Sequence, residues 1–477
     1  MPAGVKFSPG PADDPRVTSL LTLAGARDET RPRTAGRALR VHAPTIAVSA
    51  ALAWWATYFT WGTGGREPRV LSIACALLLM GMLLVRPWRT VPVAALVLCN
   101  GVGVAAFTVV LTAPTGLAGV HEAASYAYTA QLGLLVLAWA STAPRRTALL
   151  TALLAAAGLQ FTQGWLPWWG LQDPTKLFQG TFYWHNQAGI FLAAGALLAF
   201  TVVVAGHRPL APLAWVVGPL CAAGVVFTTS RGSQLGLVLG TLMLLGLAVA
   251  CPGVRRRAWR LVGVAGLSWV LAQVLVGPPF FAQRVSAAAS TAARADSFVS
   301  NGVQRIEDWR RAFAIFWEWP VTGAGFYSFD SATDIATTKR DGVSTAFAHN
   351  GFLQALADGG AVLAVPLFLA VGAVLVVSLR ALPAALRAGD LVRLGALVTL
   401  LVLLLHSGMD FDWTYPALLS LAALVSVLAL PPQPDLGRRS RVVGMTFAAT
   451  SVLLLVAAMV GAWQGGLDLN TTIATPR

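Results

Sequence analysis

The chain has 477 residues, of which 56% are hydrophobic and only 11% are charged. Soluble globular domains carry roughly 25% charged residues, so this composition excludes a water-soluble fold. The net charge is +14, but the basic residues stand in short clusters between long apolar runs. A nucleic-acid-binding protein gathers them into basic stripes with aromatic or motif context. The composition therefore indicates a multi-pass membrane protein and predicts no nucleic-acid partner.

Residues 1–42 precede the first apolar run and contain seven basic and four acidic side chains with several Pro and Gly. They lack the apolar stretch of a signal peptide, so we expect a disordered cytosolic N-terminal tail. The four cysteines lie within or at the ends of the apolar runs, without C-x-x-C spacing. They are interpreted as small core residues.

A helix needs about 20 apolar residues to cross ~30 Å of hydrocarbon. The windows that qualify are 43–61, 69–85, 91–112, 124–141, 147–165, 186–205, 210–229, 232–251, 259–277, 359–379, 391–408, 415–430 and 441–463. None of them shows the period-2 alternation of a barrel strand. The predicted fold class is an all-α polytopic membrane protein with 12–13 transmembrane helices.

The basic residues of the short loops orient these helices, because such residues stay cytosolic. With the N-terminus inside, the short loops divide 15 to 5 in favour of the inner side. This orientation predicts nine transmembrane helices within 43–277, an extracytoplasmic loop at 278–358, four helices within 359–463 and a short C-terminal tail at 464–477. If the 441–463 window did not span, only the C-terminus would change side.

Polar residues far apart in the sequence then fall on the predicted outer side. Asn186 and Gln187 open a helix that enters the lipid, and we expect them to line a pocket. His185, just before them, is as well explained by simple solvation. Arg231 stands between two predicted spans that are joined by almost no loop. Placing an arginine at the membrane edge costs free energy, so its presence indicates a functional role. The less favoured alternative is an arginine that snorkels from a helix end to water.

Residues 303–317 place Val303, Ile306, Trp309 and Phe313 at helical spacing, with charged residues on the other face. This pattern predicts an amphipathic helix in the membrane interface, ended by the turn at 320–325. Arg305 on this helix is a candidate site residue. The alternative is that it pairs with Asp308 at i+3, worth a few tenths of a kcal/mol.

His349 and Asn350 follow, at the start of the helix that leads into the 359–379 span. A lone His is usually structural, but two outer arginines and a His form a workable set for displacing a diphosphate. Arginine is a bidentate donor to phosphate oxygens, and a histidine can accept the proton of an attacking hydroxyl.

Asp410 and Asp412 lie at the outer end of the 391–408 window. D-x-D pairs hold a divalent cation in some sugar-transfer enzymes, but hydrogen bonds to loop backbone or to an arginine are the favoured interpretation. No metal or other cofactor is predicted.

Taken together, residues 180–415 resemble the superfamily of O-antigen ligases and O-antigen polymerases, which are membrane glycosyltransferases similar to the broad GT-C class. The resemblance rests on WHNQA at 184–188, TSRG at 229–232, Arg305 with Trp309, the PVTGAG turn at 320–325, His349-Asn350 with the glycines at 359–360, and DFDW at 410–413. A thirteenth span, the N-terminal tail and His185 depart from the family pattern.

The resemblance implies a function and a site. Arg231 and Arg305 match the family's two arginines that grip the lipid-linked diphosphate, and His349 matches its histidine, which activates the acceptor hydroxyl. The implied enzyme is an inverting glycosyltransferase in the bacterial cytoplasmic (inner) membrane, acting at the outer face on a glycan carried by polyprenyl (undecaprenyl) diphosphate. Its acceptor is a hydroxyl of a glycan, lipid or protein, and it works among membrane lipids.

Two alternatives stay open at this point. The residues do not separate a ligase from a polymerase. A transporter or flippase would also have many helices, but transporters show internal repeats and charges at the membrane midplane, neither of which this sequence displays.

Overall fold

The structure is a computed structural model that describes residues 35–60, 62–170, 177–251, 253–276, 291–336, 346–432 and 441–473. The chain divides into two compact units, Met1–Pro44 and Thr45–Arg477. Most of the predicted N-terminal tail, residues 1–34, lies outside the described residues. The candidate site residues all belong to the second unit.

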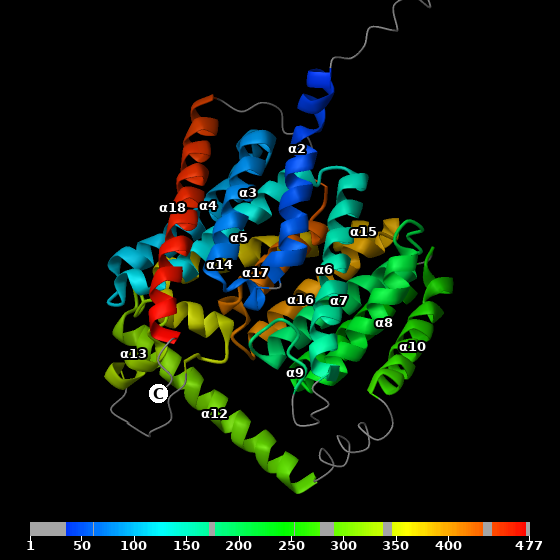
Figure 1. Cartoon of the computed structure of the whole chain (residues 1–477). Helices are drawn as coiled ribbons and strands as arrows, with labels where there is room; N and C mark the ends of the chain where they lie inside the picture. The colour runs from blue at the N-terminus through cyan, green and yellow to red at the C-terminus, as the bar shows by residue number, and fades with distance from the viewer. Residues whose placement is uncertain are drawn as a thin grey trace, which may run out of the picture. The chain divides into compact units, whose positions relative to one another are not determined.

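The regular structure of the described residues is entirely helical (Figure 1). The α-helices are α2 (Ala35–Trp54), α3 (Pro68–Val85), α4 (Val93–Thr112), α5 (Val120–Trp139), α6 (Ala143–Gly170), α7 (His185–Ala205), α8 (Ala211–Thr228), α9 (Arg231–Ala250), α10 (Trp259–Val276), α12 (Thr291–Glu318), α13 (Phe329–Ala336), α14 (Gly351–Arg380), α15 (Leu382–Ala388), α16 (Leu391–Ser407), α17 (Pro416–Ala429) and α18 (Arg441–Ile473).

Within the described residues, eight helices are long and apolar enough to cross a membrane: α3, α4, α6, α7, α8, α9, α14 and α18. Helices α16 and α17 are apolar but shorter. The predicted all-α, multi-pass membrane fold is confirmed. Each of the 13 predicted windows overlaps a helix, although how many of them cross the bilayer stays a prediction.

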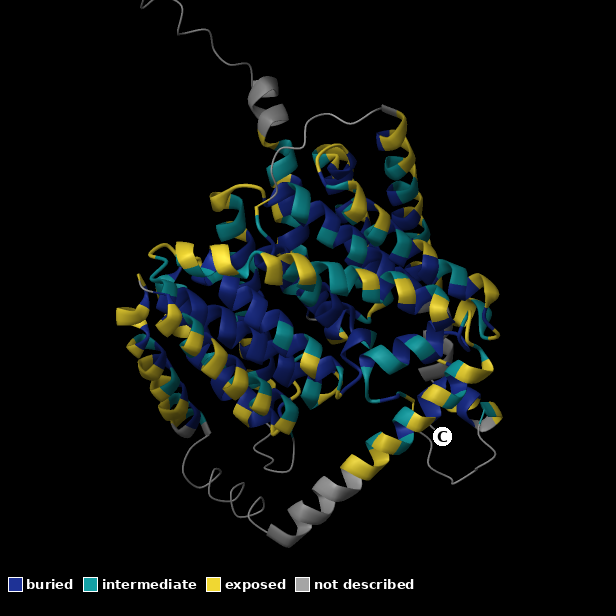
Figure 2. Ribbon diagram, turned by 180° about the vertical axis from the view of Figure 1, so that it is seen from behind, coloured by how far each residue is buried: buried dark blue, intermediate teal, exposed yellow. Residues whose placement is uncertain are grey.

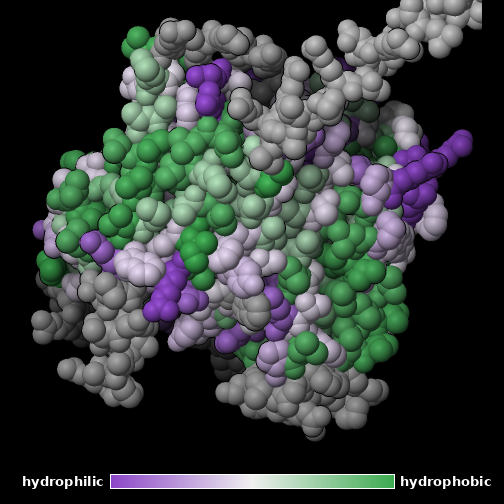
Figure 3. Space-filling model, turned by 45° about the horizontal axis from the view of Figure 1, so that its top comes forward, coloured by the Kyte–Doolittle hydropathy of each residue, from purple (hydrophilic) through white to green (hydrophobic). Residues whose placement is uncertain are grey.

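The core of the second unit is built around α7. This helix is apolar on all sides, and 94% of its most apolar window is buried, as expected of a helix enclosed by others. Helices α6, α8, α9 and α16 pack against it, and Figure 2 shows buried residues concentrated on the inward sides of the helices. By contrast, α9 and α14 are only 22% buried. Broad hydrophobic areas therefore lie on the surface, separated by groups of hydrophilic side chains (Figure 3).

Helix α12 lies at the lower edge of Figure 1, below the bundled helices. Val303, Ile306, Phe313 and Trp317 are all exposed on it, at the spacing that predicted an interfacial amphipathic helix. Its buried polar residues are Asp308 and Arg311, whose side chains pair at 3.3 Å. This exposed apolar stripe suits a helix that lies along a lipid surface.

The turn that follows α12 is bonded to α14 at a break in the α14 helix. Gly360 has φ 52° and ψ −154°, so α14 consists of two segments, and the predicted span from 359 corresponds to the second. The turn at 320–325 supplies partners for the broken backbone: Ala361 N donates to Pro320 O at 2.9 Å, and Gly325 N donates to Asp358 O at 2.9 Å. The turn after α12 is thus hydrogen-bonded into the body of α14.

Only glycine fits where these two backbones meet. A Cβ on Gly360 would lie 2.5 Å from Gly323 N, and one on Gly323 would lie 2.3 Å from the carbonyl carbon of Asp358. Both residues also have positive φ, which L side chains rarely adopt. The contact between the turn at 320–325 and α14 therefore requires glycine at both Gly323 and Gly360.

Gly360→Ala should lower the unfolding free energy by about 1–3 kcal/mol, because alanine is strained at this φ and ψ and its Cβ overlaps the turn. Thermal unfolding in detergent, followed by tryptophan fluorescence, measures the effect. Gly372→Ala is the matched control in the same helix, since a Cβ on Gly372 would have no neighbour within 4 Å; there alanine should be neutral or stabilise by about 0.5–1 kcal/mol. Equal melting temperatures for the two variants would contradict the packing argument.

Candidate active site

The carboxylate of Asp410 lies at the centre of the candidate site. It is 1% exposed and occupies the short loop between α16 and α17. Asn186 Nδ2 donates to its Oδ2 at 2.7 Å and Gln187 Nε2 to its Oδ1 at 3.3 Å. Both donors stand in the first turn of α7, where the helix dipole also favours a negative charge. The sequence predicted that these two residues line a pocket. In the structure their side-chain amides donate hydrogen bonds to the carboxylate of Asp410.

Two cationic or ionisable side chains approach the same carboxylate from other elements. Arg305 of α12 has Nη2 3.8 Å from Asp410 Oδ2, and His349 has Nδ1 3.6 Å from Asp410 Oδ1. Both distances are beyond a normal hydrogen bond, so these are loose ion-pair contacts. The alternative partner considered for Arg305, Asp308, pairs with Arg311 instead.

Burial alone would raise the pKa of Asp410. The nearby ring of His349 and the positive charges of His406 and Arg305 outweigh that effect and hold the pKa below its ordinary value. Asp410 consequently stays a carboxylate through the neutral and mildly acidic range.

His349 is held in a left-handed backbone conformation, with φ 47°, which is uncommon for a residue with a side chain. Its carbonyl oxygen accepts a 3.5 Å hydrogen bond from Trp309 Nε1 of α12, and its ring meets Phe411 edge-on at 5.1 Å. Its side chain keeps 27% of its surface exposed. A strained, fixed and partly open histidine is suited to proton transfer.

Asn350 connects this histidine to the Asp410 loop. Its Oδ1 caps α14 by accepting from Phe352 N and Leu353 N, while its Nδ2 donates to Gly408 O at 2.8 Å. Its role in the structure is to position its neighbours.

Asp412 belongs to a second buried chain of hydrogen bonds. His406 Nδ1 is 2.7 Å from its Oδ2, and the other ring nitrogen, Nε2, is 3.3 Å from Ser233 Oγ. Gln187 Nε2 reaches Asp412 Oδ1 at 3.4 Å, which links this chain to Asp410. Both aspartates therefore accept hydrogen bonds from side chains.

Arg231 is the first residue of α9 and is exposed. The helix start is fixed around it: Ser230 caps the helix through Ser233 N, Ser233 Oγ donates to Asn186 O at 3.2 Å, and a Cβ on Gly232 would be 3.2 Å from His406. These contacts hold the N-terminus of α9 against α7 and α16, beside the aspartates.

His185 has a structural contact. Its Nδ1 lies 2.9 Å from the carbonyl oxygen of Thr228 at the end of α8, which ties the start of α7 to the turn before Arg231.

Several polar residues at this end of the bundle were not singled out from the sequence. His406 and Ser233 are buried within apparently apolar helices, and the one available signal was that His406 stands six residues before Asp412 at a helix end. Arg66 was also missed: it donates to Tyr327 Oη at 3.2 Å and lies 3.9 Å from Glu122. Short loops that are distant in sequence meet here, which no spacing rule reveals.

Long apolar helices with a buried polar cluster at their ends define a multi-pass membrane protein that has an Arg-His-Asp site. Residues 216–368, about a third of the chain, match the family model described as O-Antigen ligase. This part of the chain is therefore similar to O-antigen ligases. The matched region contains Arg231, Arg305 and His349 and ends before Asp410. Comparison with curated proteins gave no match.

The two bonds of Asn350 can be separated by substitution. Asn350→Asp keeps the capping oxygen, since Asp and Asn cap equally well, but loses the donor to Gly408. Asn350→Ala loses both and should cost about 1 kcal/mol of stability. Amide hydrogen exchange should therefore rise in the 408–412 loop of both variants, and at Phe352 and Leu353 only in Asn350→Ala. Unchanged exchange in the loop would show that Asn350 does not hold it.

Proposed function

We propose that this protein transfers or polymerises glycan from a polyprenyl-diphosphate carrier at the outer face of the bacterial cytoplasmic membrane, with inversion at the anomeric carbon. The family supports glycosyl transfer of the O-antigen ligase or polymerase kind in general. The observation that carries the finer proposal is the convergence of Arg305 and His349 on the buried carboxylate of Asp410.

A diphosphate suits this end of the bundle. The first turns of α7, α9 and α14 meet here through the contacts of Asn186, Ser233 and Asn350, and each helix N-terminus favours an anion. Arg305 and Arg231 would add two guanidinium groups that match phosphate oxygens. We assign both arginines to the diphosphate.

The reaction exchanges one C–O bond for another. The acceptor hydroxyl oxygen forms a bond to the anomeric carbon, the bond from that carbon to the diphosphate oxygen breaks, and the lipid diphosphate leaves with the electron pair. The arginines neutralise the added charge on the leaving group. His349 takes the hydroxyl proton, and the acceptor belongs to a glycan, a lipid or a protein.

Asp410 positions the base. A carboxylate facing His349 Nδ1 holds the proton on that nitrogen and leaves Nε2 to accept the proton of the hydroxyl. It also stabilises the imidazolium that forms, as in the catalytic triad of hydrolases. Asp410 also accepts hydrogen bonds from the side-chain amides of Asn186 and Gln187 and from the backbone N–H of Phe411.

The decisive experiment is reconstitution in liposomes with labelled polyprenyl-diphosphate glycan and candidate acceptors. Label moving to an acceptor indicates a ligase, and lengthening of the labelled lipid indicates a polymerase. His349→Ala should abolish either, whereas His207→Gln, at the far end of α7, should not. Label that only crosses the bilayer, or a His349→Ala protein as active as wild type, would favour the transporter.

Asp410→Asn should lower the transfer rate about 10²-fold or more, the usual contribution of general base catalysis, because an amide cannot stabilise the imidazolium. Initial rates at saturating donor measure it. Since the pKa of Asp410 is lowered, the carboxylate stays ionised in mildly acidic media, so the ratio of the wild-type rate to the Asp410→Asn rate should be the same there as at neutral pH.

Arg305→Ala should cut kcat/KM by about 10²-fold, the typical effect of removing one group that stabilises transition-state charge. Arg310→Ala, on the same helix, is the control, because Arg310 is 70% exposed and pairs with Glu307. If the two variants transfer glycan equally well, Arg305 does not hold the diphosphate.

A further inference from the structure

A second group of polar side chains, centred on Arg66, adjoins the Asp410 site. Arg66 lies in the loop between α2 and α3, where its Nη2 donates to Tyr327 Oη at 3.2 Å. The same nitrogen is 3.9 Å from Oε1 of Glu122, in the first turn of α5. The guanidinium carbon lies 5.8 Å from the ring centre of Tyr327 and 5.5 Å from that of Tyr415. These four residues form the Arg66 cluster.

The backbone around the cluster is shaped to bring these side chains together. Gly64 has φ 66°, and a Cβ on it would lie 2.6 Å from Phe182 and 2.7 Å from Tyr415, so the loop packs directly on the start of α17. Tyr327 has φ 60°, which is uncommon for a residue with a side chain. Strained conformations of this kind persist where the surrounding structure holds them and are frequent at ligand sites.

The cluster lies close to the proposed base. The ring of His349 is 5.1 Å from that of Phe411, and the ring of Phe411 is 6.2 Å from that of Tyr415. Two aromatic side chains therefore connect His349 to Arg66. A ligand that extends from His349 along these rings meets the Arg66 cluster.

This approach differs from the one assigned to the donor. Arg305 contacts the site through the carboxylate of Asp410, whereas Arg66 adjoins it through Phe411 and Tyr415. A transferase has to hold both substrates in position at the same time. With the donor's diphosphate on Arg305 and Arg231, the Arg66 cluster is left for the acceptor.

The charges of the cluster favour an uncharged ligand. Glu122 is buried, and its carboxylate faces the guanidinium of Arg66, so the positive charge already has a counter-ion. An anionic ligand at Arg66 would be repelled by this carboxylate. A neutral ligand would bind without that cost.

The hydrogen-bonding groups of the cluster fit hydroxyls. A guanidinium has five N–H donors, and Arg66 keeps 24% of its side-chain surface exposed. Oε2 of Glu122 is buried and has no hydrogen-bond partner within the described residues, which costs free energy until a donor satisfies it. A hydroxyl both donates and accepts. Adjacent hydroxyls can therefore accept from Arg66 and donate to Glu122.

Exposed aromatic rings add the apolar part of the surface. Tyr327 is 41% exposed and offers a ring together with its hydroxyl. Tyr183 is also exposed and directly follows Phe182, whose ring packs against Tyr415 at 5.6 Å. Tyrosine combines an apolar body with a polar tip. This combination matches a sugar ring, which has apolar faces and hydroxyl edges.

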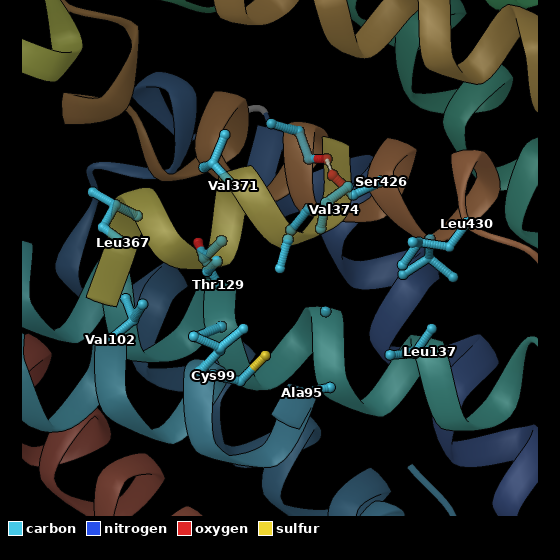
Figure 4. Close-up of a pocket in the computed structure, with 18 of the residues that line it drawn as sticks. Ala95, Cys99, Val102, Thr129, Leu137, Leu367, Val371, Val374, Ser426 and Leu430 are labelled. Carbon is cyan, nitrogen blue, oxygen red and sulfur yellow. Dashed lines mark hydrogen bonds between the residues drawn. The ribbon is translucent and has the colours of Figure 1, made fainter. Parts of the chain in front are cut away.

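The apolar cavity nearby does not suit a saccharide. It has a volume of about 340 Å³ and lies among α4, α5, α14, α16 and α17 (Figure 4). Ser426, one of its few polar lining residues, already donates to Ala422 O of its own helix at 2.7 Å. A sugar would lose its hydrogen bonds to water there and gain almost none, whereas the Arg66 cluster supplies both donors and acceptors.

We propose that the Arg66 cluster binds an uncharged saccharide unit of the acceptor. Arg66 donates hydrogen bonds to its hydroxyls, Glu122 accepts one, and the ring of Tyr327 packs against its apolar face. The assignment rests on the proposed function, because it names the class of acceptor and leaves the transfer step at His349. It selects a neutral glycan or glycolipid among the glycan, lipid and protein acceptors.

Acceptor kinetics in liposomes test the assignment. With glycolipids that carry neutral hexose oligosaccharides as acceptors, Arg66→Ala should raise the acceptor KM about 10–100-fold, the effect of losing a hydrogen bond to a charged group. The donor KM and kcat should not change. Arg69→Ala is the matched control, because Arg69 is exposed in the first turn of α3, outside the cluster, and should match wild type. Arg66→Lys keeps a charge facing Glu122 and should raise the acceptor KM less.

Three kinetic results would overturn the assignment: a wild-type acceptor KM in Arg66→Ala, an effect confined to kcat or the donor KM, or transfer by wild type only to serine peptides or sugar-free lipids. The second is expected if Arg66 merely anchors the turn before α13. If wild-type protein transferred glycan to no acceptor at all, the proposed function would fail, and the next measurement would decide on the cluster alone.

Saturation-transfer NMR of the full-length protein in detergent measures binding without turnover. The probes are methyl glycosides of neutral hexoses and of the matching uronic acids. Neutral glycosides should receive saturation from wild type and Arg69→Ala, and several-fold less from Arg66→Ala. Equal saturation from wild type and Arg66→Ala would contradict a saccharide site at Arg66. Arg66-dependent binding of the uronic acids alone would contradict the preference for an uncharged sugar.

Discussion

The structure depends on keeping a buried carboxylate charged. Removing a carboxylate from water costs several kcal/mol unless partners compensate for the loss, and Asp410 is almost completely buried. Its compensation comes from three directions: the amides of Asn186 and Gln187, the guanidinium of Arg305 and the ring of His349. Because these partners stand on three different elements, satisfying this one charge fixes the start of α7, the amphipathic helix α12 and the entry to α14 relative to one another.

The second constraint is the break in α14, where backbone hydrogen bonds join the turn after α12 to α14. An ordinary helix through Gly360 would satisfy its own hydrogen bonds and leave the turn after α12 unattached. Since the break frees backbone groups that Pro320 and Gly325 then engage, α12 is bonded to the helix that begins beside His349. One irregularity therefore attaches the helix that carries Arg305 to the helix that begins beside His349.

The sequence predicted those features that depend on local composition. Apolar length located the helices, and the spacing of Val303, Ile306 and Phe313 predicted the amphipathic helix. The contacts of His406 and Ser233 were not predictable, because both residues are isolated within apolar runs and their partners are separated by 173 residues. The turn at 320–325 was recognised as the end of a helix, but not as a partner of the glycines at 359–360. Pairings between loops are set by packing, which periodicity does not report.

The long contacts at Asp410 acquire a meaning under the proposed function. At 3.8 and 3.6 Å, neither Arg305 nor His349 is locked to the carboxylate, so Asp410 is shared between a cation that would bind the donor and the base that would gain a proton. A diphosphate competes with Asp410 for Arg305, because it offers more oxygens and more charge. As Arg305 turns to the diphosphate, the low-pKa carboxylate loses one compensating charge and gains by facing an imidazolium. Donor binding would thereby leave Asp410 facing His349 alone, which couples the arrival of the leaving group to the carboxylate that orients the base.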